Sequence, residues 1–149
     1  MNAPALASTL ALTGIMVMAT TGHAQTPGVT HTSATDVTAL FAKPGGGTVA
    51  DDPHYKVMVS TRTGAGEAEL HSRDTDIFYI VEGSATFVTG GTISGAHETA
   101  PNETRGTGLE GGVEQTLSAG DVVTIDAGVP HWFKAVGGRV RYFVVKVKR

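Results

Sequence analysis

The sequence predicts an all-β domain, a sandwich or a closed barrel, with a short helix near its N-terminal end. The chain contains 20 glycines among 149 residues, and they lie between short apolar runs. From residue 54 onward, apolar and polar side chains alternate along these runs with a period of two, which is typical of strands. Short strands with a turn signal about every ten residues indicate a sandwich or barrel. We therefore expect helix to make up less than about a fifth of the chain.

The first 24 residues differ from the rest of the chain. Every Asp, Glu, Lys and Arg lies after Ala24, and residues 5–21 are apolar or small. Gly22 and Ala24 place small residues at positions minus three and minus one of a cleavage site. Residues 1–24 are therefore predicted to be a secretory signal peptide, with the mature chain starting near Gln25. A membrane anchor is the alternative, but hydroxyl side chains make the run weakly apolar for a span of about 20 residues. We expect a periplasmic or secreted protein with no membrane contact after processing.

Residues 25–50 are expected to form a flexible lead and one short helix. The segment 25–33 is rich in threonine and shows no apolar periodicity. Thr35 is expected to cap a helix over residues 36–43, in which apolar side chains recur at spacings of three and four. The Pro-Gly-Gly-Gly run at 44–47 then ends the helix.

Residues 51–149 are expected to form the β-barrel domain. Glycines separate its short runs, and each run has a length typical of a strand. The expected strands cover residues 54–62, 67–72, 76–82, 84–89, 113–118, 121–127, 131–136 and 139–147.

Residues 91–112 interrupt this pattern with a polar stretch rich in glycine, threonine and glutamate. A segment of this length without structure is usually a functional lid or a disordered insertion. Its ionisable side chains are expected to be solvated loop residues. They include His97, Glu98, Glu103 and Arg105.

The composition excludes several classes of function. Cysteine is absent, which removes disulfides, thiolate zinc sites and cysteine nucleophiles. Lys and Arg number 11 against 14 Asp and Glu, so no basic excess exists to neutralise phosphates, and we expect no nucleic-acid partner. A small-molecule ligand or substrate is the expected partner.

Two strands and a later turn carry the residues that point to chemistry. Residues two apart share a strand face, so Glu69 and His71 point the same way. Asp76 begins the next strand in phase with Phe78, and a carboxylate there is costly to bury unless it is paired or coordinated. His131 opens a strand directly after a tight turn. The four donors suit a divalent first-row metal such as Mn, Fe, Ni, Co or Zn.

The same positions have alternative roles. His71 and His131 would otherwise be buried structural histidines. Glu69 would otherwise be a general base beside the metal, or a partner in a plain ion pair. Glu67 shares their strand face but lies further out, so it is expected to be a solvated carboxylate at the rim.

Aromatic residues follow the same alternation. Phe78 is in phase with Asp76, and Phe133 is in phase with His131, so both are expected to line a substrate pocket, with core packing as the alternative. Trp132 points the other way and is expected to be a core or interface aromatic.

These residues resemble the two sequence motifs of the cupin superfamily. The first motif has the form G-x5-H-x-H-x3–4-E-x6-G. Here Glu69 and His71 occupy the H-x-H positions, Asp76 the acidic position and Gly83 the final glycine. The second motif, G-x5-P-x-G-x2-H-x3-N, is matched in spacing by Gly120, Gly128 and His131.

The match departs from the motifs at four positions. Glu69 replaces the first histidine, Asp76 replaces glutamate, Asp126 replaces proline and Ala135 replaces asparagine. The resemblance spans about residues 56–148. It implies a cupin-type β-barrel, also called a double-stranded β-helix or jelly roll, that holds a metal inside and usually forms a homodimer.

Two functions remain open at this point. One is a metal-dependent cupin enzyme acting on a small organic molecule, of the lyase, isomerase or dioxygenase type; its metal would polarise an oxygen while a nearby carboxylate moves a proton. The other is a non-catalytic exported cupin that binds a small ligand. All these chemistries occur on cupins, so the fold does not choose among them.

Overall fold

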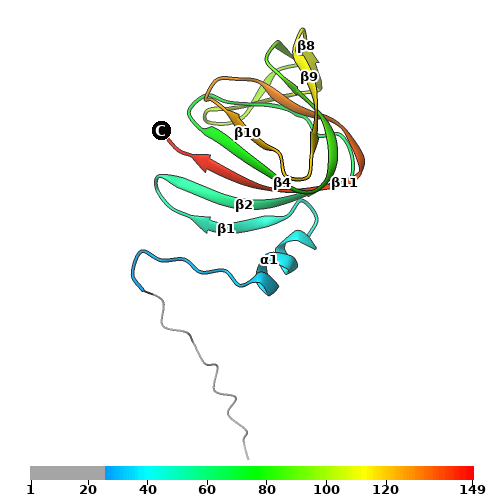
Figure 1. Ribbon diagram of the computed structural model, residues 1–149. Coiled ribbons are helices and arrows are strands. Elements are labelled where there is room, and N and C mark those ends of the chain that lie inside the picture. Colours follow the sequence, from blue (N-terminus) through cyan, green and yellow to red (C-terminus); the bar gives the residue numbers. More distant parts are fainter. Residues whose placement is uncertain (1–25) are drawn as a thin grey trace, which may run out of the picture.

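The computed structural model describes residues 26–149, so the predicted signal peptide lies outside the described residues. The described chain is mostly β and forms a curled antiparallel sheet, a half-barrel, with one short helix near its N-terminal end (Figure 1). This confirms the predicted fold class. Between residues 26 and 149, no helix is both long and apolar enough to cross a membrane.

Eleven strands follow the helix α1 (Ala34–Phe41) in the described chain. They are β1 (Gly47–Asp51), β2 (Tyr55–Arg62), β3 (Ala68–His71), β4 (Thr75–Thr89), β5 (Thr92–Ser94), β6 (His97–Ala100), β7 (Glu103–Gly106), β8 (Gly108–Glu110), β9 (Val113–Ser118), β10 (Val122–Ile125) and β11 (His131–Val147). The main sheet runs in the order β1-β2-β11-β3-β7-β6, and β4 pairs with β9, β10 and β11. The strands β5 and β8 form a separate two-stranded sheet.

The helix α1 starts earlier than expected. The backbone N–H of Asp36 donates a hydrogen bond to Oγ of Ser33 at 3.1 Å, so Ser33 is the N-cap. The expectation that Thr35 caps the helix is therefore wrong, because Thr35 lies inside it. Phe41 is buried and meets the ring of Phe143 edge-on, with centroids 5.7 Å apart, which fixes the helix against β11.

The lead expected over residues 25–50 ends in a strand. The strand β1 pairs antiparallel with β2, so residues 47–51 belong to the main sheet. The strand is difficult to recognise in the sequence because it begins within a run of three glycines and its burial pattern does not alternate.

Two long strands replace four predicted short ones. The strand β4 runs through Gly83, and β11 runs through Gly137 and Gly138. Gly83 has φ of 80°, and a Cβ atom there would overlap the carbonyl oxygen of Arg139 on the neighbouring strand. The register between the two strands shifts on both sides of this crossing, so each strand bends without breaking.

The insertion at residues 91–112 is ordered into four short strands, β5 to β8, which corrects the expectation of a lid or a disordered segment. The strand β7 pairs antiparallel with β3, with Arg105 opposite Glu69 and Glu103 opposite His71. Directly opposed residues share a sheet face, so this pairing adds two charged side chains beside the predicted site. The expectation that Glu103 and Arg105 are solvated loop residues is wrong, because both are half-buried in a sheet.

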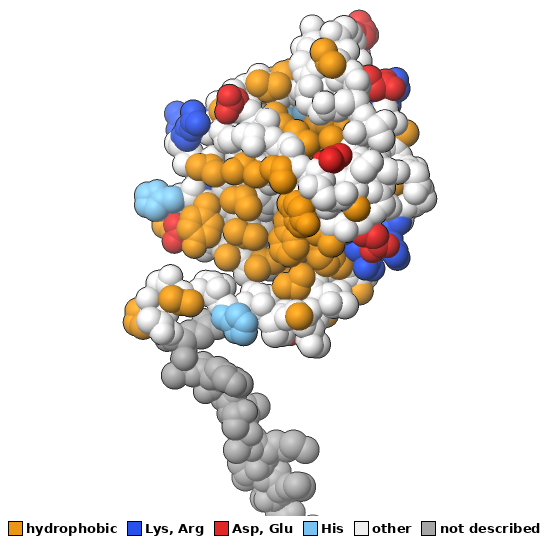
Figure 2. Space-filling model, viewed as in Figure 1, with side chains coloured by type: hydrophobic (Ala, Val, Ile, Leu, Met, Phe, Trp, Pro, Cys, Tyr) orange, Lys and Arg blue, Asp and Glu red, His pale blue; other side chains and the backbone are white. Residues whose placement is uncertain are grey.

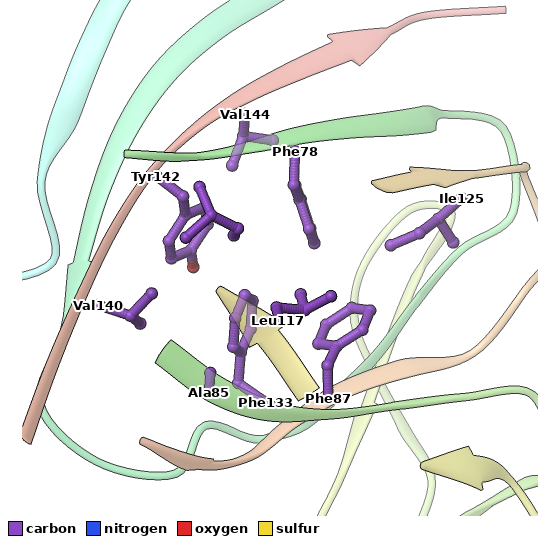
Figure 3. Packing of buried hydrophobic residues seen from close by; sticks show 10 residues of the cluster. Phe78, Ala85, Phe87, Leu117, Ile125, Phe133, Val140, Tyr142 and Val144 are labelled. Atoms are coloured by element: carbon purple, nitrogen blue, oxygen red, sulfur yellow. The ribbon is translucent and has the colours of Figure 1, made fainter. Parts of the chain in front are cut away.

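The hydrophobic core fills the inside of the curled sheet. On β4 the members of the core cluster change from even numbers before Gly83, Phe78 and Ile80, to odd numbers after it, Ala85 and Phe87. Figure 3 shows side chains from facing strands pointing toward one another in this space. The cluster comprises Phe78, Ile80, Ala85, Phe87, Leu117, Ile125, Phe133, Val140, Tyr142 and Val144.

The molecule also carries apolar side chains on its surface. In Figure 2 they gather above helix α1, over the region where Figure 1 draws β2, β4 and β11. Tyr79 on β4 and Val122 on β10 are both exposed, and they lie opposite one another across the strand pair.

Candidate metal centre

The curled sheet borders a partly open cavity of about 680 Å³. All six residues singled out as candidate ligands or pocket residues line it. These are Glu69, His71, Asp76, Phe78, His131 and Phe133. Phe78 and Phe133 were expected either to line a pocket or to pack in the core. Each does both, because it belongs to the buried core cluster and also borders the cavity.

Three strand ends bring the candidate ligands together. The strand β3 carries Glu69 and His71, β4 begins beside Asp76, and β11 begins at His131 directly opposite Glu69. The turn before β11 is fixed to β3, because the N–H of Gly128 donates to the carbonyl oxygen of His71 at 2.8 Å. Gly128 adopts φ of 83°, a conformation that favours glycine.

Each of the two imidazoles offers one nitrogen to the cavity. His131 Nδ1 lies 3.1 Å from the carbonyl oxygen of Val129, which can only accept, so Nδ1 carries the proton and Nε2 has the lone pair. Burial lowers the pKa of His131, so this ring is neutral near pH 7. His71 Nε2 is buried and has no hydrogen-bond partner among residues 26–149.

Carboxylate oxygens surround these nitrogens. His71 Nε2 lies 3.4 Å from Oε2 of Glu69 and 3.5 Å from Oδ2 of Asp76, while His131 Nε2 lies 3.6 Å from the same Oδ2. The Nε2 lone pair of His131 and the carboxylate oxygen that it faces repel one another, and a cation between them removes the repulsion. The buried and unpartnered Nε2 of His71 therefore fits a metal ion.

Glu69 is held in place by two guanidinium groups. Arg62 and Arg105 approach its Oε1 at 3.3 Å and 3.2 Å. Burial raises the pKa of Glu69, but His71, Arg105, His131 and Arg62 outweigh burial and lower this pKa to about 2. The side chain is therefore a carboxylate at neutral pH, with Oε1 bound by arginines and Oε2 directed toward His71.

Asp76 has a partner that the sequence reasoning missed. Lys146 Nζ donates to both of its oxygens, at 2.8 Å and 3.0 Å. A signal for this residue was present, because Lys146 continues the alternation of the buried Tyr142 and Val144 on β11 and a charge in that phase points inward.

Further charged residues complete the rim of the site. Glu103 lies 4.0 Å from Nδ1 of His71, and Nε of Arg105 donates to Glu103 at 2.7 Å. Glu67 is 56% exposed and pairs only loosely with Arg105 at 3.5 Å, which agrees with its expected place at the rim. Trp132 donates through its indole N–H to the carbonyl oxygen of Gly66 at 2.7 Å and also borders the cavity.

Three of the four predicted donors, all except Asp76, form a cluster that could hold a metal ion. Glu69, His71 and His131 each offer one ligand atom, and these atoms lie within 4.8 Å of one another. Imidazole nitrogens with a carboxylate oxygen suit divalent first-row metals, and this donor set alone does not select one of them.

Comparison with known proteins identifies the family. The profile of the family described as Cupin matches residues 55–148. No curated protein matches the sequence.

Solved structures share the fold at low sequence identity. A cupin-2 domain containing protein from Shewanella frigidimarina aligns with a TM-score of 0.54 and 16% identity, over 78% of this chain and 94% of that one. An uncharacterized conserved protein with a double-stranded beta-helix domain from Klebsiella pneumoniae aligns with a TM-score of 0.53 and 15% identity, over 75% of this chain and 86% of that one.

Proposed function

Because this chain belongs to the cupin family, we propose that it is a metal-dependent enzyme that acts on a small organic molecule inside its barrel. The observation that carries the proposal is the buried, unpartnered Nε2 of His71, which faces two carboxylates at the wall of a cavity of about 680 Å³. Cavities of roughly 300–1,000 Å³ are typical of small-molecule sites. The reaction is of the lyase, isomerase or dioxygenase type.

Different residues of this chain have different roles at the proposed site. His71, His131 and Glu69 would hold the metal, which supplies a Lewis acid that polarises a substrate oxygen. Arg62 and Arg105 keep Glu69 ionised and fix its orientation. The carboxylates nearest the imidazoles are also the groups placed to accept a proton from a bound molecule.

One observation favours the alternative, an exported cupin that binds a small ligand without catalysis. Both carboxylates beside the imidazoles are already paired with cationic side chains, Glu69 with two arginines and Asp76 with Lys146. The protein therefore has charge balance at the site without a metal. A turnover screen with Mn, Fe, Ni, Co and Zn separates the two functions when run beside a thermal-shift screen of small ligands.

Elemental analysis of the purified protein is the first test. The enzyme proposal expects close to one equivalent of a divalent first-row metal per chain. Protein that binds ligands in the thermal-shift screen with no metal present, and that turns over nothing with any of the five metals, would favour the binding module.

The variant Glu69→Gln distinguishes a ligand from a general base. We expect a loss of metal affinity of about 10- to 100-fold, because a neutral amide is a much weaker donor than the carboxylate it replaces. Metal affinity is measured by competition with a chelator. Glu67→Gln is the matched control, since Glu67 also pairs with Arg105 but is exposed at the rim, and it should bind metal like the parent. Full metal content with lost turnover in Glu69→Gln would instead make Glu69 a base.

We further propose that the protein is exported and forms a homodimer. The charge-free, apolar character of residues 1–24 supports export to the periplasm or medium, and family membership supports the dimer. Mass spectrometry of the exported protein should find a terminus near Gln25, and light scattering should give twice the mass of the processed chain.

A further inference from the structure

Lys146 is placed to control the metal site from outside the ligand set. It lies directly opposite Asp76 where β11 pairs with β4, and its ammonium group contacts both oxygens of that carboxylate. Asp76 is almost fully buried, with its side chain 3% exposed, and the side chain of Lys146 is 18% exposed. This ion pair is therefore a fixed part of the cavity wall.

The same carboxylate lies close to both imidazoles. Oδ2 of Asp76 lies 3.5 Å from Nε2 of His71 and 3.6 Å from Nε2 of His131, but only 3.0 Å from Nζ of Lys146. A metal held by the two histidines would therefore meet an oxygen that a lysine already binds.

We propose that Lys146 competes with the metal for Asp76 and so weakens metal binding, leaving Glu69, His71 and His131 as the stronger ligands. The inference rests on the proposed metal site and adds a positioning residue to it. Two effects act in the same direction. The ammonium occupies a carboxylate that would otherwise donate to the metal, and its positive charge repels a divalent cation nearby.

The consequence is that the site binds metal more weakly than its four nearby donor residues suggest. Fewer protein oxygens would also coordinate the metal than these residues could offer. Positions that Asp76 does not fill remain open to a small molecule. Lys146 thus lowers the affinity for the metal and leaves space at the site for a substrate to bind.

The test uses Lys146→Met, which keeps most of the length of the side chain and removes its charged group. Affinity for Zn²⁺ and Co²⁺ is measured by chelator competition on the whole protein. We expect tighter binding by about tenfold or more, since a like charge is removed and Asp76 is released to bind metal. Bound Co²⁺ should also absorb less strongly in the visible range, because its coordination number rises.

Two control variants separate this effect from general changes. Lys56 lies opposite Lys146 on β2 and lines the same cavity, but its carboxylate partner is Asp51, outside the ligand cluster. Lys56→Met should change metal affinity by less than about threefold, and Lys146→Arg, which keeps the charge, should stay near the parent. A lysine with a purely structural role would not tighten metal binding when it is removed.

A second variant tests the proposal if Lys146→Met does not fold. Asp76→Asn in the parent should cost less metal affinity than Glu69→Gln, because Asp76 is already engaged by Lys146. An equal or larger loss in Asp76→Asn would overturn the proposal, as would equal or weaker metal binding by a folded Lys146→Met. Metal binding that appears only in Lys146→Met would support it, and absence of binding in both parent and variant would overturn it. A third result is that the parent and its variants show the expected order of metal affinities while the parent turns over no substrate. That result would refute the proposed enzyme and support the role of Lys146.

Discussion

His71→Ala and His131→Ala are each expected to lose the metal, with affinity falling by at least about a hundredfold. Each substitution removes a nitrogen donor from a three-residue cluster, and an even milder change around a ligand commonly costs about 10–100-fold. Within residues 26–149, no other histidine forms part of this cluster. Elemental analysis after dialysis, and titration with Zn²⁺ or Co²⁺, measure the loss.

His97→Ala is the matched control for both variants. His97 is exposed on β6, and its ring contacts a backbone carbonyl of the same insertion, that of Gly95, at 3.2 Å. This variant should keep the metal content of the parent. Full metal content in both His71→Ala and His131→Ala would show that the metal binds elsewhere.

The largest loss of stability is expected for Phe87→Ala, at about 3–5 kcal/mol. Phe87 is fully buried, and its ring lies 4.8 Å from that of Phe133 and 5.8 Å from that of Phe78, centroid to centroid. Alanine would leave a void among these rings, which rigid strands on both sides cannot close. Urea unfolding followed by circular dichroism gives the free energy of unfolding.

An exposed valine supplies the comparison. Val113 is 69% exposed on β9, so Val113→Ala should change the free energy of unfolding by less than about 0.5 kcal/mol. A loss below about 1 kcal/mol for Phe87→Ala would mean that the inside of the half-barrel is loosely packed. Because the ring of Phe87 also lies 6.1 Å from that of His131, this variant should weaken metal binding as well.

The candidate ligands could be found from the sequence because local rules place them. Glu69 and His71 share a strand face by the period of two. A single turn separates them from Asp76 on the next strand, and another turn leads to His131. Spacing within each of the two motifs carries this information without any knowledge of the rest of the sheet.

The cationic half of the site depends on pairing between distant segments. Arg105 reaches Glu69 only because β7 pairs with β3, and the polar, glycine-rich sequence around it gave no strand signal. Lys146 lies 70 residues from Asp76, and only the register of β11 against β4 brings the two together. Alternation shows that a side chain points inward, but not which residue it will meet there.

The strand boundaries show the same limit at Gly83. Glycine between two apolar runs is equally compatible with a turn and with a bend inside one strand. Here the close approach of Arg139 and the register shift make it a bend, so the class of fold could be predicted while the number of strands could not.

The place of β11 in the sheet has a consequence for how the protein is made. This strand pairs with β2, β3 and β4, so it joins both parts of the main sheet, yet it is the last strand of the chain. The ribosome synthesises residues 26–130 before this strand, and during that time none of these three pairings can form. The growing polypeptide must therefore keep the edges of β2, β3 and β4 open until residues 131–147 emerge. Sheets dominated by such distant pairings fold slowly, in about milliseconds to seconds, and expose aggregation-prone edges meanwhile. Exposure of these open strand edges before residues 131–147 are available is thus a property of this topology, whatever the barrel binds.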